Sequence, residues 1–458
     1  MSIPRIMIAA PKSGSGKTLI TCALLGALKK RNIDVVSCKC GPDYIDPMFH
    51  RTVLGVPSEN LDTYFTGEDK TRQIFASFSK GHDMAVMEGV MGLYDGVGGI
   101  EEAGSSYHLA KVTKTPVILV VDAHGMGRSV LSVISGFKFY DKDNLIKGII
   151  LNRISKSFYE NIKEITEKET GIKLLGFFEN NNDFYVPERH LGLTLPAEIE
   201  DIRSKISHCA SLFEETVDVD KIIEISKCME GENPVVNKDK IYKAEERLNL
   251  AVARDEAFCF YYDANIRILE KMGVVIKYFS PIHDGNLPED IDGILLGGGY
   301  PELYAYELSK NVSMLEDIKF AINNDIPSLA ECGGFMYLHK TLKDENGNSY
   351  NMAGVIDKDI FYAGKLVRFG YIEMLDKKEV FLKKGSLIRG HEFHYYNSTD
   401  NGTDVKAVKP VTEKSWECCY TEGNHWWGFP HLYYPSCEEF AEAFVEKMKA
   451  YRHSNNGV

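Results

Sequence analysis

The sequence predicts an α/β fold, with a doubly wound parallel sheet in the first half of the chain and a second α/β domain in the second half. Short apolar runs alternate with stretches of helical periodicity, as expected when helices connect parallel strands. The first apolar run leads through a glycine-rich loop into a helix-like stretch. A polar stretch, 232–246, has almost no apolar periodicity and is predicted to link domains at 1–231 and 247–445.

The composition of the 458-residue chain, 44% hydrophobic and 26% charged, is that of a globular protein with two or three domains. No run of about 18 apolar residues predicts a transmembrane helix, and MSIPRIMIAAPKSG leads into the glycine-rich loop instead of a signal-peptide cleavage site. We therefore expect a cytoplasmic protein with no membrane partner. A net charge of −13 argues against non-specific nucleic-acid binding, so we expect no nucleic-acid partner, and an anionic substrate requires a local basic patch.

The ten cysteines are scattered among apolar, strand-like runs, a distribution typical of reduced thiols. The close pairs, in CKC and ECCY, lack the spacing of a zinc site, so we do not expect metal binding by cysteine.

The first two elements are predicted to form a phosphate-binding loop. The strand-like RIMIAAP is followed by KSGSGKTLITCALLGALKKR, with glycines, a Lys-Thr pair and apolar residues at helical spacing. In such a loop, backbone N–H groups face an anion, Lys17 reaches the outer phosphates and the Thr18 hydroxyl can bind magnesium. Pro11 replaces the first glycine of the usual pattern. A structural glycine turn is the alternative. The residues predicted to bind ATP are Lys12, Gly14, Gly16, Lys17, Thr18 and Asn152.

Three later apolar runs end in polar side chains. DMAVMEGVMGLYDG contains Glu88 at the end of its strand-like part, TPVILVVDAHG contains Asp122 and IKGIILNRI contains Asn152. Ligands of parallel sheets bind at the carboxyl ends of the strands, where we expect these side chains and Lys17 to meet. For Glu88 we favour magnesium or substrate binding over a helix cap.

The segment VSCKCGPDYIDPMFH is predicted to be rich in turns, because Gly41-Pro42 forces a loop and Pro47 stops a strand. Acids beside a nucleotide site bind metal or orient the substrate. The polar and aromatic residues gathered here are Lys39, Asp43, Tyr44, Asp46 and His50.

Four motifs in this order, APKSGSGKT, KCGPDYIDPMFH, LDTYF and MEGVMGLYDG, resemble the cobyrinic acid a,c-diamide synthases, whose amino-terminal domain is similar to dethiobiotin synthetase. The resemblance extends over roughly residues 4–440. It implies that Asp43, Tyr44 and Asp46 bind the substrate and that Thr18, Asp43 and Glu88 bind magnesium. It also implies a second domain that supplies amide nitrogen.

The second half of the chain fits this expectation. RLNLAVARDEAFCFYYDANIRILEKMG predicts a strand, a turn and an amphipathic helix, DGILLGGGYPELY a strand that leads into three glycines, and IPSLAECGGFMYL a strand followed by a sharp turn. This pattern resembles the class I glutamine amidotransferase fold, in which a cysteine lies at a strand-to-helix elbow.

Cys332 is the predicted nucleophile. At a helix amino terminus, backbone N–H groups and the helix dipole favour the thiolate and lower its pKa, while Gly333 and Gly334 permit the tight turn. The N–H groups of Gly298 or Gly299, with that of Gly333, are the expected oxyanion hole. The alternative is a small buried hydrophobic residue, as expected for the other nine cysteines.

His431, in WWGFPHLYYPS, is the predicted base, because the resembled amidotransferases have theirs near this point. Ordinary members of that class have Glu two residues after the histidine, where this chain has Tyr433. The cobyrinic acid synthases are similar in having a Cys-His pair without that acid. What orients the imidazole stays open, and a backbone carbonyl is one candidate.

The stretch RGHEFHYYN lacks the H-E-x-x-H spacing of zinc proteases. Strand alternation places His391 and Phe393 on one face and Glu392 and His394 on the other. The stretch also resembles the same family, which implies that it lines the glutamine pocket or the domain interface, and a polar edge strand is the alternative.

The resemblance implies amidation of the a- and c-carboxylates of cobyrinic acid in cobalamin biosynthesis, with glutamine or ammonia as nitrogen source and ATP and Mg²⁺ as cofactors, through an acyl phosphate. The expected partners are small molecules only: a polycarboxylate tetrapyrrole, L-glutamine and ATP. The oligomeric state stays open, with a homodimer as one candidate.

The alternatives are another tetrapyrrole, such as hydrogenobyrinic acid or nickel sirohydrochlorin, or a cell-wall or biotin precursor. A further rival is a P-loop switch ATPase of the partitioning kind, which also has a lysine at the position of Lys12 but has no use for Cys332 and His431.

Overall fold

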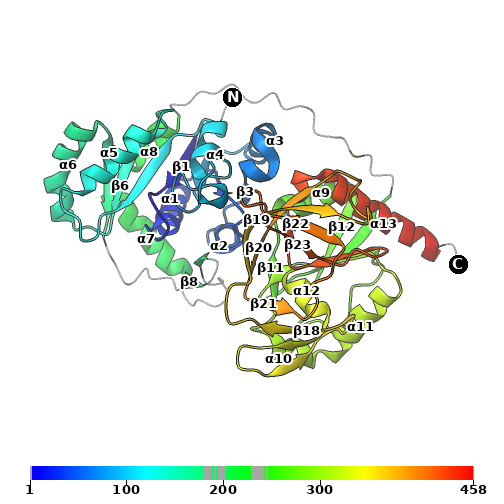
Figure 1. Cartoon of the computed structure of the whole chain (residues 1–458). Helices are drawn as coiled ribbons and strands as arrows, with labels where there is room; N and C mark the ends of the chain where they lie inside the picture. Colours follow the sequence, from blue (N-terminus) through cyan, green and yellow to red (C-terminus); the bar gives the residue numbers. More distant parts are fainter. Residues whose placement is uncertain are drawn as a thin grey trace. The chain divides into compact units, whose positions relative to one another are not determined.

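The chain forms two compact units, Met1–Asp239 and Lys240–Val458, and each is described here by itself (Figure 1). The computed structural model describes residues 3–179, 188–189, 192–193, 202–227, 242 and 246–456. The predicted linker, 232–246, lies outside the described residues except for Tyr242 and Glu246. The predicted domain boundaries stay predictions.

The amino-terminal unit is built on a seven-stranded parallel sheet in the order β3-β2-β4-β1-β5-β6-β7. Its strands are β1 (Arg5–Ala9), β2 (Val35–Cys40), β3 (Ser58–Leu61), β4 (Met84–Glu88), β5 (Val117–Asp122), β6 (Ile146–Asn152) and β7 (Lys173–Phe178). The short strands β8 (Glu188–Arg189) and β9 (Gly192–Leu193) pair separately.

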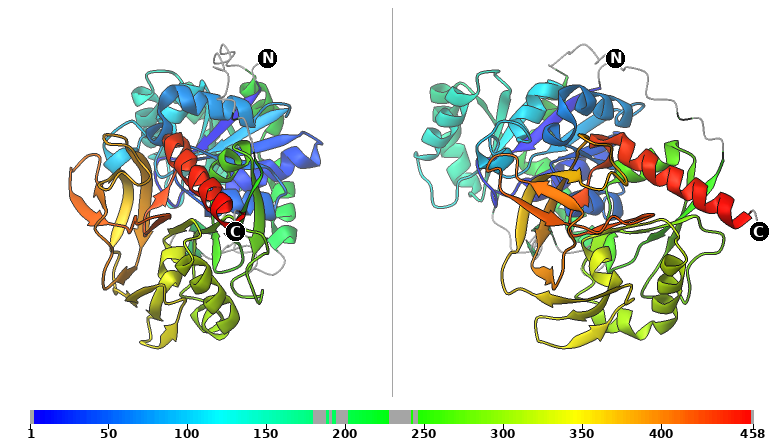
Figure 2. Two further views of the ribbon diagram at one scale, coloured as in Figure 1. Left: turned by 90° about the vertical axis from the view of Figure 1, so that its right-hand side faces the viewer. Right: turned by 45° about the vertical axis from the view of Figure 1, so that its right-hand side comes forward.

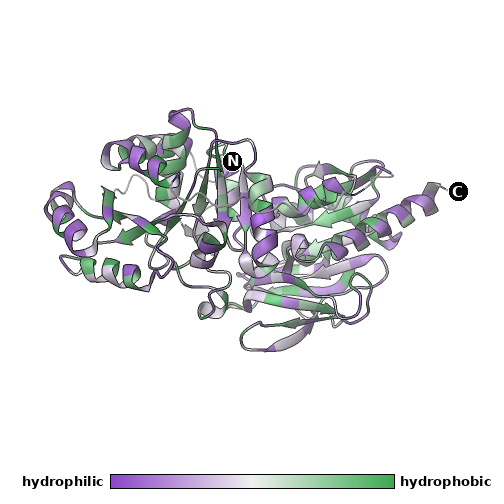
Figure 3. Ribbon diagram, turned by 90° about the horizontal axis from the view of Figure 1, so that it is seen from above, coloured by the Kyte–Doolittle hydropathy of each residue, from purple (hydrophilic) through white to green (hydrophobic). Residues whose placement is uncertain are grey.

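Helices cover both faces of this sheet, because successive strand residues point to opposite sides and both sides are apolar. Met7 and Ala9 of β1 pack with helices α3 to α6, whereas Ile6 and Ile8 pack with α1, α7 and α8. The helices are α1 (Lys17–Lys30), α2 (Ile45–Thr52), α3 (Thr63–Phe78), α4 (Ser106–Thr113), α5 (Val130–Tyr140), α6 (Lys156–Thr170), α7 (Ile202–Thr216) and α8 (Val219–Ser226), with the 3₁₀ turn η1 (Val97–Gly99). Figure 3 shows the apolar colour along the strands and the hydrophilic colour on the outer sides of helices.

The carboxy-terminal unit has a five-stranded parallel sheet in the order β12-β10-β13-β15-β24. Its strands are β10 (Leu248–Ala253), β12 (Val274–Phe279), β13 (Gly293–Leu296), β15 (Ser328–Glu331) and β24 (His425–Gly428), and β11 (Phe258–Phe260) pairs with β14 (Gly298–Gly299). Its helices are α9 (Asp263–Lys271), α10 (Ala305–Lys310), α11 (Val312–Asn323), α12 (Gly333–Leu338) and α13 (Glu438–Asn456), with the 3₁₀ turn η4 (Tyr434–Ser436).

Two further sheets complete this unit. An antiparallel sheet has the order β23-β22-β19-β20-β25, and a mixed sheet has the order β17-β16-β18-β21. The strands are β16 (His339–Lys343), β17 (Ser349–Asn351), β18 (Ile356–Tyr362), β19 (Arg368–Asp376), β20 (Ile388–His394), β21 (Tyr396–Ser398), β22 (Val405–Val408), β23 (Ser415–Cys418) and β25 (His431–Leu432). In Figure 2 the antiparallel strands, coloured orange, form a layer beside the parallel sheet of the same unit.

The predicted strands that position the motifs are present, and Glu88, Asp122 and Asn152 are each the last residue of their strand. The turn-rich interpretation of the segment around Asp43 is wrong in two of its parts, because β2 precedes the loop and Asp46 lies in the first turn of α2. Among the described residues, no helix is long and apolar enough to cross a membrane. The cytoplasmic location stays a prediction.

Candidate functional site

The glycine-rich loop joins β1 to α1 in the predicted way. Gly14 and Gly16 have φ angles of 73° and 91°, which L-residues with a side chain rarely adopt. A Cβ at Gly16 would lie 2.2 Å from Nδ2 of Asn152, so only glycine fits there. That same Nδ2 donates to the carbonyl of Ser15 at 2.9 Å, and Asn152 therefore fixes the loop from the end of β6.

Lys17, the first residue of α1, is buried and donates to the carbonyls of Met91 at 2.6 Å and Lys12 at 3.5 Å. Burial, followed by the nearby charge of Lys39, lowers the pKa of Lys17 to about 8. The side chain of Lys12 is exposed.

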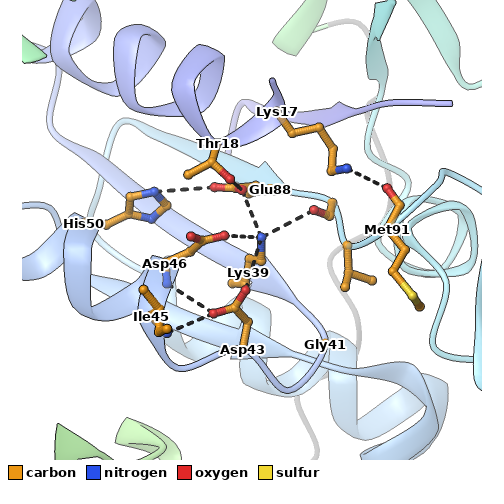
Figure 4. A network of polar contacts seen from close by, with 12 residues as sticks. Lys17, Thr18, Lys39, Gly41, Asp43, Ile45, Asp46, His50, Glu88 and Met91 are labelled. Atoms are coloured by element: carbon orange, nitrogen blue, oxygen red, sulfur yellow. Dashed lines mark hydrogen bonds and ion pairs between the residues drawn. The ribbon is translucent and has the colours of Figure 1, made fainter. Parts of the chain in front are cut away.

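At the same sheet edge, a buried network joins Thr18 to the acids of β4 and α2 (Figure 4). The Thr18 hydroxyl donates to Oε1 of Glu88 at 2.7 Å. The ammonium of Lys39, on β2, lies 2.9 Å from the same oxygen, pairs closely with Asp46 and lies 3.7 Å from Oδ2 of Asp43. The structure therefore brings four of the predicted metal and substrate residues together around Lys39, for which no role was predicted: Thr18, Asp43, Asp46 and Glu88.

The protonation of this network follows from burial and from mutual charge. Burial, with the charge of Asp46, raises the pKa of Glu88 to about 8 and that of Asp43 to about 7. Burial alone would raise the pKa of Asp46 as well, but Lys39 lowers it. For Lys39, burial lowers the pKa, yet the three carboxylates together raise it well above its ordinary value.

Three predicted or nearby residues lie in α2 and the loop before it: Asp43, Tyr44 and His50. Asp43 accepts hydrogen bonds from the N–H groups of Ile45 and Asp46, so it caps the start of α2. His50 is fully buried, hydrogen-bonds Ser37 at 2.9 Å, and its Nε2 lies 3.5 Å from Oε2 of Glu88. Tyr44 is buried just before the helix.

The fit of a magnesium ion rests on the oxygen donors of the network. Oδ1 of Asp46 and Oε2 of Glu88 are buried and receive no hydrogen bond from a side-chain or backbone donor other than the carboxyl groups of this pair. With the Thr18 hydroxyl they are hard oxygen ligands of the kind that Mg²⁺ prefers. No cluster of three or more His, Cys, Asp or Glu residues arranged to hold a metal occurs in the described part of the chain.

Asp122 and Arg153 complete the edge. Asp122 accepts from the Arg153 guanidinium at 2.9 Å, and that guanidinium also donates to the carbonyl of Gly14. The expected meeting of Lys17, Glu88, Asp122 and Asn152 at one sheet edge agrees with the parallel register of β1, β4, β5 and β6.

In the carboxy-terminal unit, Cys332 lies at the predicted elbow between β15 and α12. Its φ of 47° and ψ of −101° are strained for a residue with a side chain. Its N–H donates to the carbonyl of Gly428 at 2.8 Å. A Cβ at Gly334 would lie 2.1 Å from the carbonyl oxygen of Leu296, so the elbow requires glycine there.

The predicted lowering of the thiol pKa is wrong for this structure. Cys332 is 7% exposed, and burial, followed by the charge of Glu302, raises its pKa above the ordinary value. The hydrogen bond from Gly333 acts in the expected direction but is outweighed. The helix that begins at Gly333 has only six residues, and its dipole is correspondingly short.

The predicted oxyanion groups lie beside the elbow. A Cβ at Gly333 would lie 3.1 Å from the backbone nitrogen of Gly299, so these two residues are in direct contact. A Cβ at Gly298 would lie 2.4 Å from Cε1 of His431. The structure thus brings His431 against the glycine loop after β13, which packs beside the elbow.

His431 lies in β25, where it pairs with His391 of β20, and the two rings stack at 5.0 Å. Burial, together with His391 and His394, lowers the pKa of His431 well below its ordinary value. Nδ1 of His431 lies 3.9 Å from Oε2 of Glu331, the residue immediately before Cys332. Glu331 is the first residue of the ECGG motif, and no role was predicted for it from the sequence.

The RGHEFHYYN stretch forms the predicted strand, β20, where Glu392 and His394 are both buried. His394 stacks on Phe429 with ring centroids 4.1 Å apart. Its role in a glutamine pocket stays a prediction.

Two family models match the chain. Residues 6–193 match the CobQ/CobB/MinD/ParA nucleotide binding domain, and residues 249–432 match the CobB/CobQ-like glutamine amidotransferase domain. These matches confirm the predicted fold class, a P-loop α/β domain followed by a glutamine amidotransferase domain.

Relatives with the name cobyrinate a,c-diamide synthase are similar over nearly the whole chain. The protein of Caldanaerobacter subterraneus subsp. tengcongensis is 38% identical over 449 residues, which cover 97% of this chain and 98% of the relative. That of Clostridium tetani is 39% identical over 448 residues, covering 96% and 99%. That of Thermoplasma volcanium is 36% identical over 456 residues, covering 98% of each chain.

Proposed function

The chain belongs to the cobyrinate a,c-diamide synthase family, and on that premise we propose that it amidates the a- and c-carboxylates of cobyrinic acid with glutamine as nitrogen donor and ATP as the activating substrate. Ammonia is the alternative nitrogen source, and cobalamin biosynthesis is the proposed pathway. The observation that carries the proposal is the presence of two separate sites, one in each unit, whose residues suit the two half-reactions.

The carboxy-terminal unit is proposed to release ammonia from glutamine. His431 takes the proton of the Cys332 thiol, the thiolate attacks the side-chain amide carbon, and the N–H groups of Gly299 and Gly333 bind the oxyanion. His431 then gives its proton to the leaving nitrogen, so that ammonia departs and a γ-glutamyl thioester remains, which water hydrolyses to glutamate. Because burial favours the neutral forms of both Cys332 and His431, proton transfer between them must accompany substrate attack.

The amino-terminal unit is proposed to activate the carboxylate. The glycine loop and Lys17 bind the ATP phosphates, and Lys17 exchanges its contact with the Met91 carbonyl for a phosphate oxygen. A carboxylate oxygen of the substrate takes the γ-phosphoryl group, and ADP leaves. Ammonia then attacks the acyl carbon, and inorganic phosphate departs to leave the amide.

Thr18, Glu88 and Asp46 are the residues that would hold Mg²⁺ beside the phosphates, where the ion would neutralise charge on the transferred phosphoryl group. Lys39 compensates the negative charge of the same acids. Asp43 and Tyr44, at the start of α2, are the proposed contacts to the substrate.

A panel of polycarboxylate tetrapyrroles tests the proposal. The purified protein is incubated with ATP, Mg²⁺, glutamine and either cobyrinic acid, hydrogenobyrinic acid or nickel sirohydrochlorin, and products are identified by mass. We expect the diamide of cobyrinic acid to form with the highest kcat/KM. Faster amidation of another tetrapyrrole would assign that substrate instead, and ATP hydrolysis without any amide product would contradict the proposal.

A further inference from the structure

Ordinary members of the amidotransferase class have a glutamate two residues after the catalytic histidine. This chain has Tyr433 at that position, so no acid there can orient His431. A different carboxylate reaches the same imidazole. Glu331 ends β15, whose register pairs Glu331 with Gly428 of β24, and its side chain extends to β25, the strand of His431. This acid thus directly precedes the proposed nucleophile in the chain, while two different sheets bring the acid to the histidine.

The carboxylate of Glu331 is held in a defined orientation. The N–H of Leu432 donates to Oε2 at 3.3 Å, and the hydroxyl of Tyr434 donates to Oε1 at 3.3 Å. Oε2, fixed by the residue next to His431, lies 3.9 Å from Nδ1 of the imidazole. Hydrogen bonds of this kind are often long before substrate binds and shorten in the reacting complex.

We propose that Glu331 is the positioning residue of the glutaminase site: its carboxylate accepts the Nδ1–H of His431, which leaves Nε2 to take the proton of Cys332, and it stabilises the imidazolium that forms. This inference rests on the proposed function of the carboxy-terminal unit. Gly298 packs against the same edge of the ring, because a Cβ there would lie 2.4 Å from Cε1 and 3.2 Å from Nδ1 of His431, so the absence of a side chain at Gly298 leaves room for the imidazole.

The protonation of Glu331 gives the inference a pH dependence. Burial raises the pKa of Glu331 to about 8, against the smaller opposing effect of its two hydrogen bonds. The carboxylate needed beside an imidazolium is therefore formed as the pH rises toward and through 8, and glutamine hydrolysis should increase over that range.

The other titratable groups around Glu331 and His431 are the same in the wild-type chain and in both Glu331 variants. Burial raises the pKa values of Cys332, Tyr261 and Tyr434 and lowers those of His391 and His431. The titratable groups that face Glu331 are His431, Cys332, Tyr261 and Tyr434, and those that face His431 are also His391 and His394.

The test compares Glu331→Gln and Glu331→Asp with the wild-type chain. We expect Glu331→Gln to lower the kcat of glutamine-dependent amidation about 100-fold or more, with little change in the KM for glutamine and no rise in rate through pH 8. Glu331→Asp should recover part of the kcat and restore the rise with pH. Asp376→Asn, which replaces another buried carboxylate of the same unit that binds backbone N–H groups, is the matched control and should retain wild-type glutamine kinetics.

Ammonium-dependent amidation separates this inference from the proposed function. Each variant should use ammonium at the wild-type rate, because that reaction does not involve the thiol. If Glu331→Gln does not fold, Tyr434→Phe is tested in its place. It removes the hydrogen bond from the Tyr434 hydroxyl to Oε1 of Glu331 and should lower the glutamine-dependent kcat several-fold. The role of Glu331 would be overturned if Glu331→Gln kept the wild-type kcat and pH profile, or if Tyr434→Phe did so where Glu331→Gln does not fold. A Cys332→Ala variant that uses only ammonium would still leave the proposed function intact.

Discussion

The ammonium of Lys39 lies 2.9 Å from Oε1 of Glu88, and both side chains are buried. Lys39 also pairs with Asp46 and Asp43, so one positive charge compensates three carboxylates at the edge of the sheet. A buried charge is stable only when it is paired, and removing one partner exposes the cost of burying the others.

Replacing Lys39 with Met should therefore destabilise the amino-terminal unit by about 3–5 kcal/mol, the usual cost of breaking a buried ion pair from one side. The measurement is denaturant unfolding of the wild-type and variant chains. Lys173→Met, which removes a surface lysine paired with Glu167, should change the stability by no more than about 1 kcal/mol and serves as the control. Equal stability of the two variants would show that the acids around Lys39 are protonated without it.

Cys332→Ala should abolish amidation with glutamine and preserve amidation with ammonium, since only the supply of nitrogen passes through the thiol. The measurement is the initial rate of amide formation with each nitrogen source. Cys437→Ala, at a partly buried thiol just before α13, is the control and should keep both activities. Loss of both activities in a folded Cys332→Ala chain would be evidence for one shared site instead of two.

Lys17→Ala should lower amidation by several orders of magnitude with either nitrogen source, because it removes a positive charge where the phosphoryl group is transferred. A loss at the low end corresponds to about 4 kcal/mol of transition-state stabilisation. Lys30→Ala, at the other end of α1, removes contacts to Ser207 and Ser211 and should leave the rate unchanged. A near-normal rate in Lys17→Ala would make the glycine loop a structural turn.

Local signals were sufficient to predict the parts of the fold that carry the motifs. The strand before the glycine loop, the helix from Lys17 and the elbow at Cys332 follow from apolar runs and glycines that lie within about 20 residues of one another. The family resemblance then supplied the order of the two domains, which the family models confirm.

Contacts between distant segments could not be predicted in the same way. Lys39 meets Glu88 because β2 and β4 are neighbours in the sheet, and no local pattern gives that order. Glu331 reaches His431 across 100 residues of sequence. The thiol pKa was predicted in the wrong direction, because the sequence shows the helix start after Cys332 but not the depth at which the thiol is buried.

Gly298→Ala should impair the glutaminase site alone. The added Cβ would lie 2.4 Å from Cε1 of His431, so the imidazole has to shift, and a displacement of about 1 Å can cost roughly 100-fold in rate. Gly285→Ala is the control, since a Cβ there would meet no atom within 4 Å. The rates with glutamine and with ammonium are compared for both variants, and wild-type glutamine kinetics in Gly298→Ala would place His431 outside the reaction.

The acids of the α2 region should influence which carboxylate is amidated. Asp43 caps α2 and is partly accessible, whereas Asp46 is buried against Lys39, so the two lie on a rigid helix start beside the phosphate loop. Two different side chains of the substrate have to reach the same phosphoryl donor. Losing one orienting contact would misplace one acceptor more than the other, and misalignment can cost about 100-fold while nucleotide still binds.

We therefore expect Asp43→Asn or Asp46→Asn to slow one amidation more than the other and to accumulate a monoamide. Asp43→Asn keeps a side-chain oxygen that can cap α2, so a loss of activity there would come from the charge and not from the helix. Asp46→Asn also deprives Lys39 of its closest partner, and its unfolding is measured in parallel. A time course of mono- and diamide by mass spectrometry, for the wild-type chain and both variants, gives the two rate constants. Equal slowing of both steps with weaker ATP binding would instead limit both acids to magnesium binding and remove them from substrate choice.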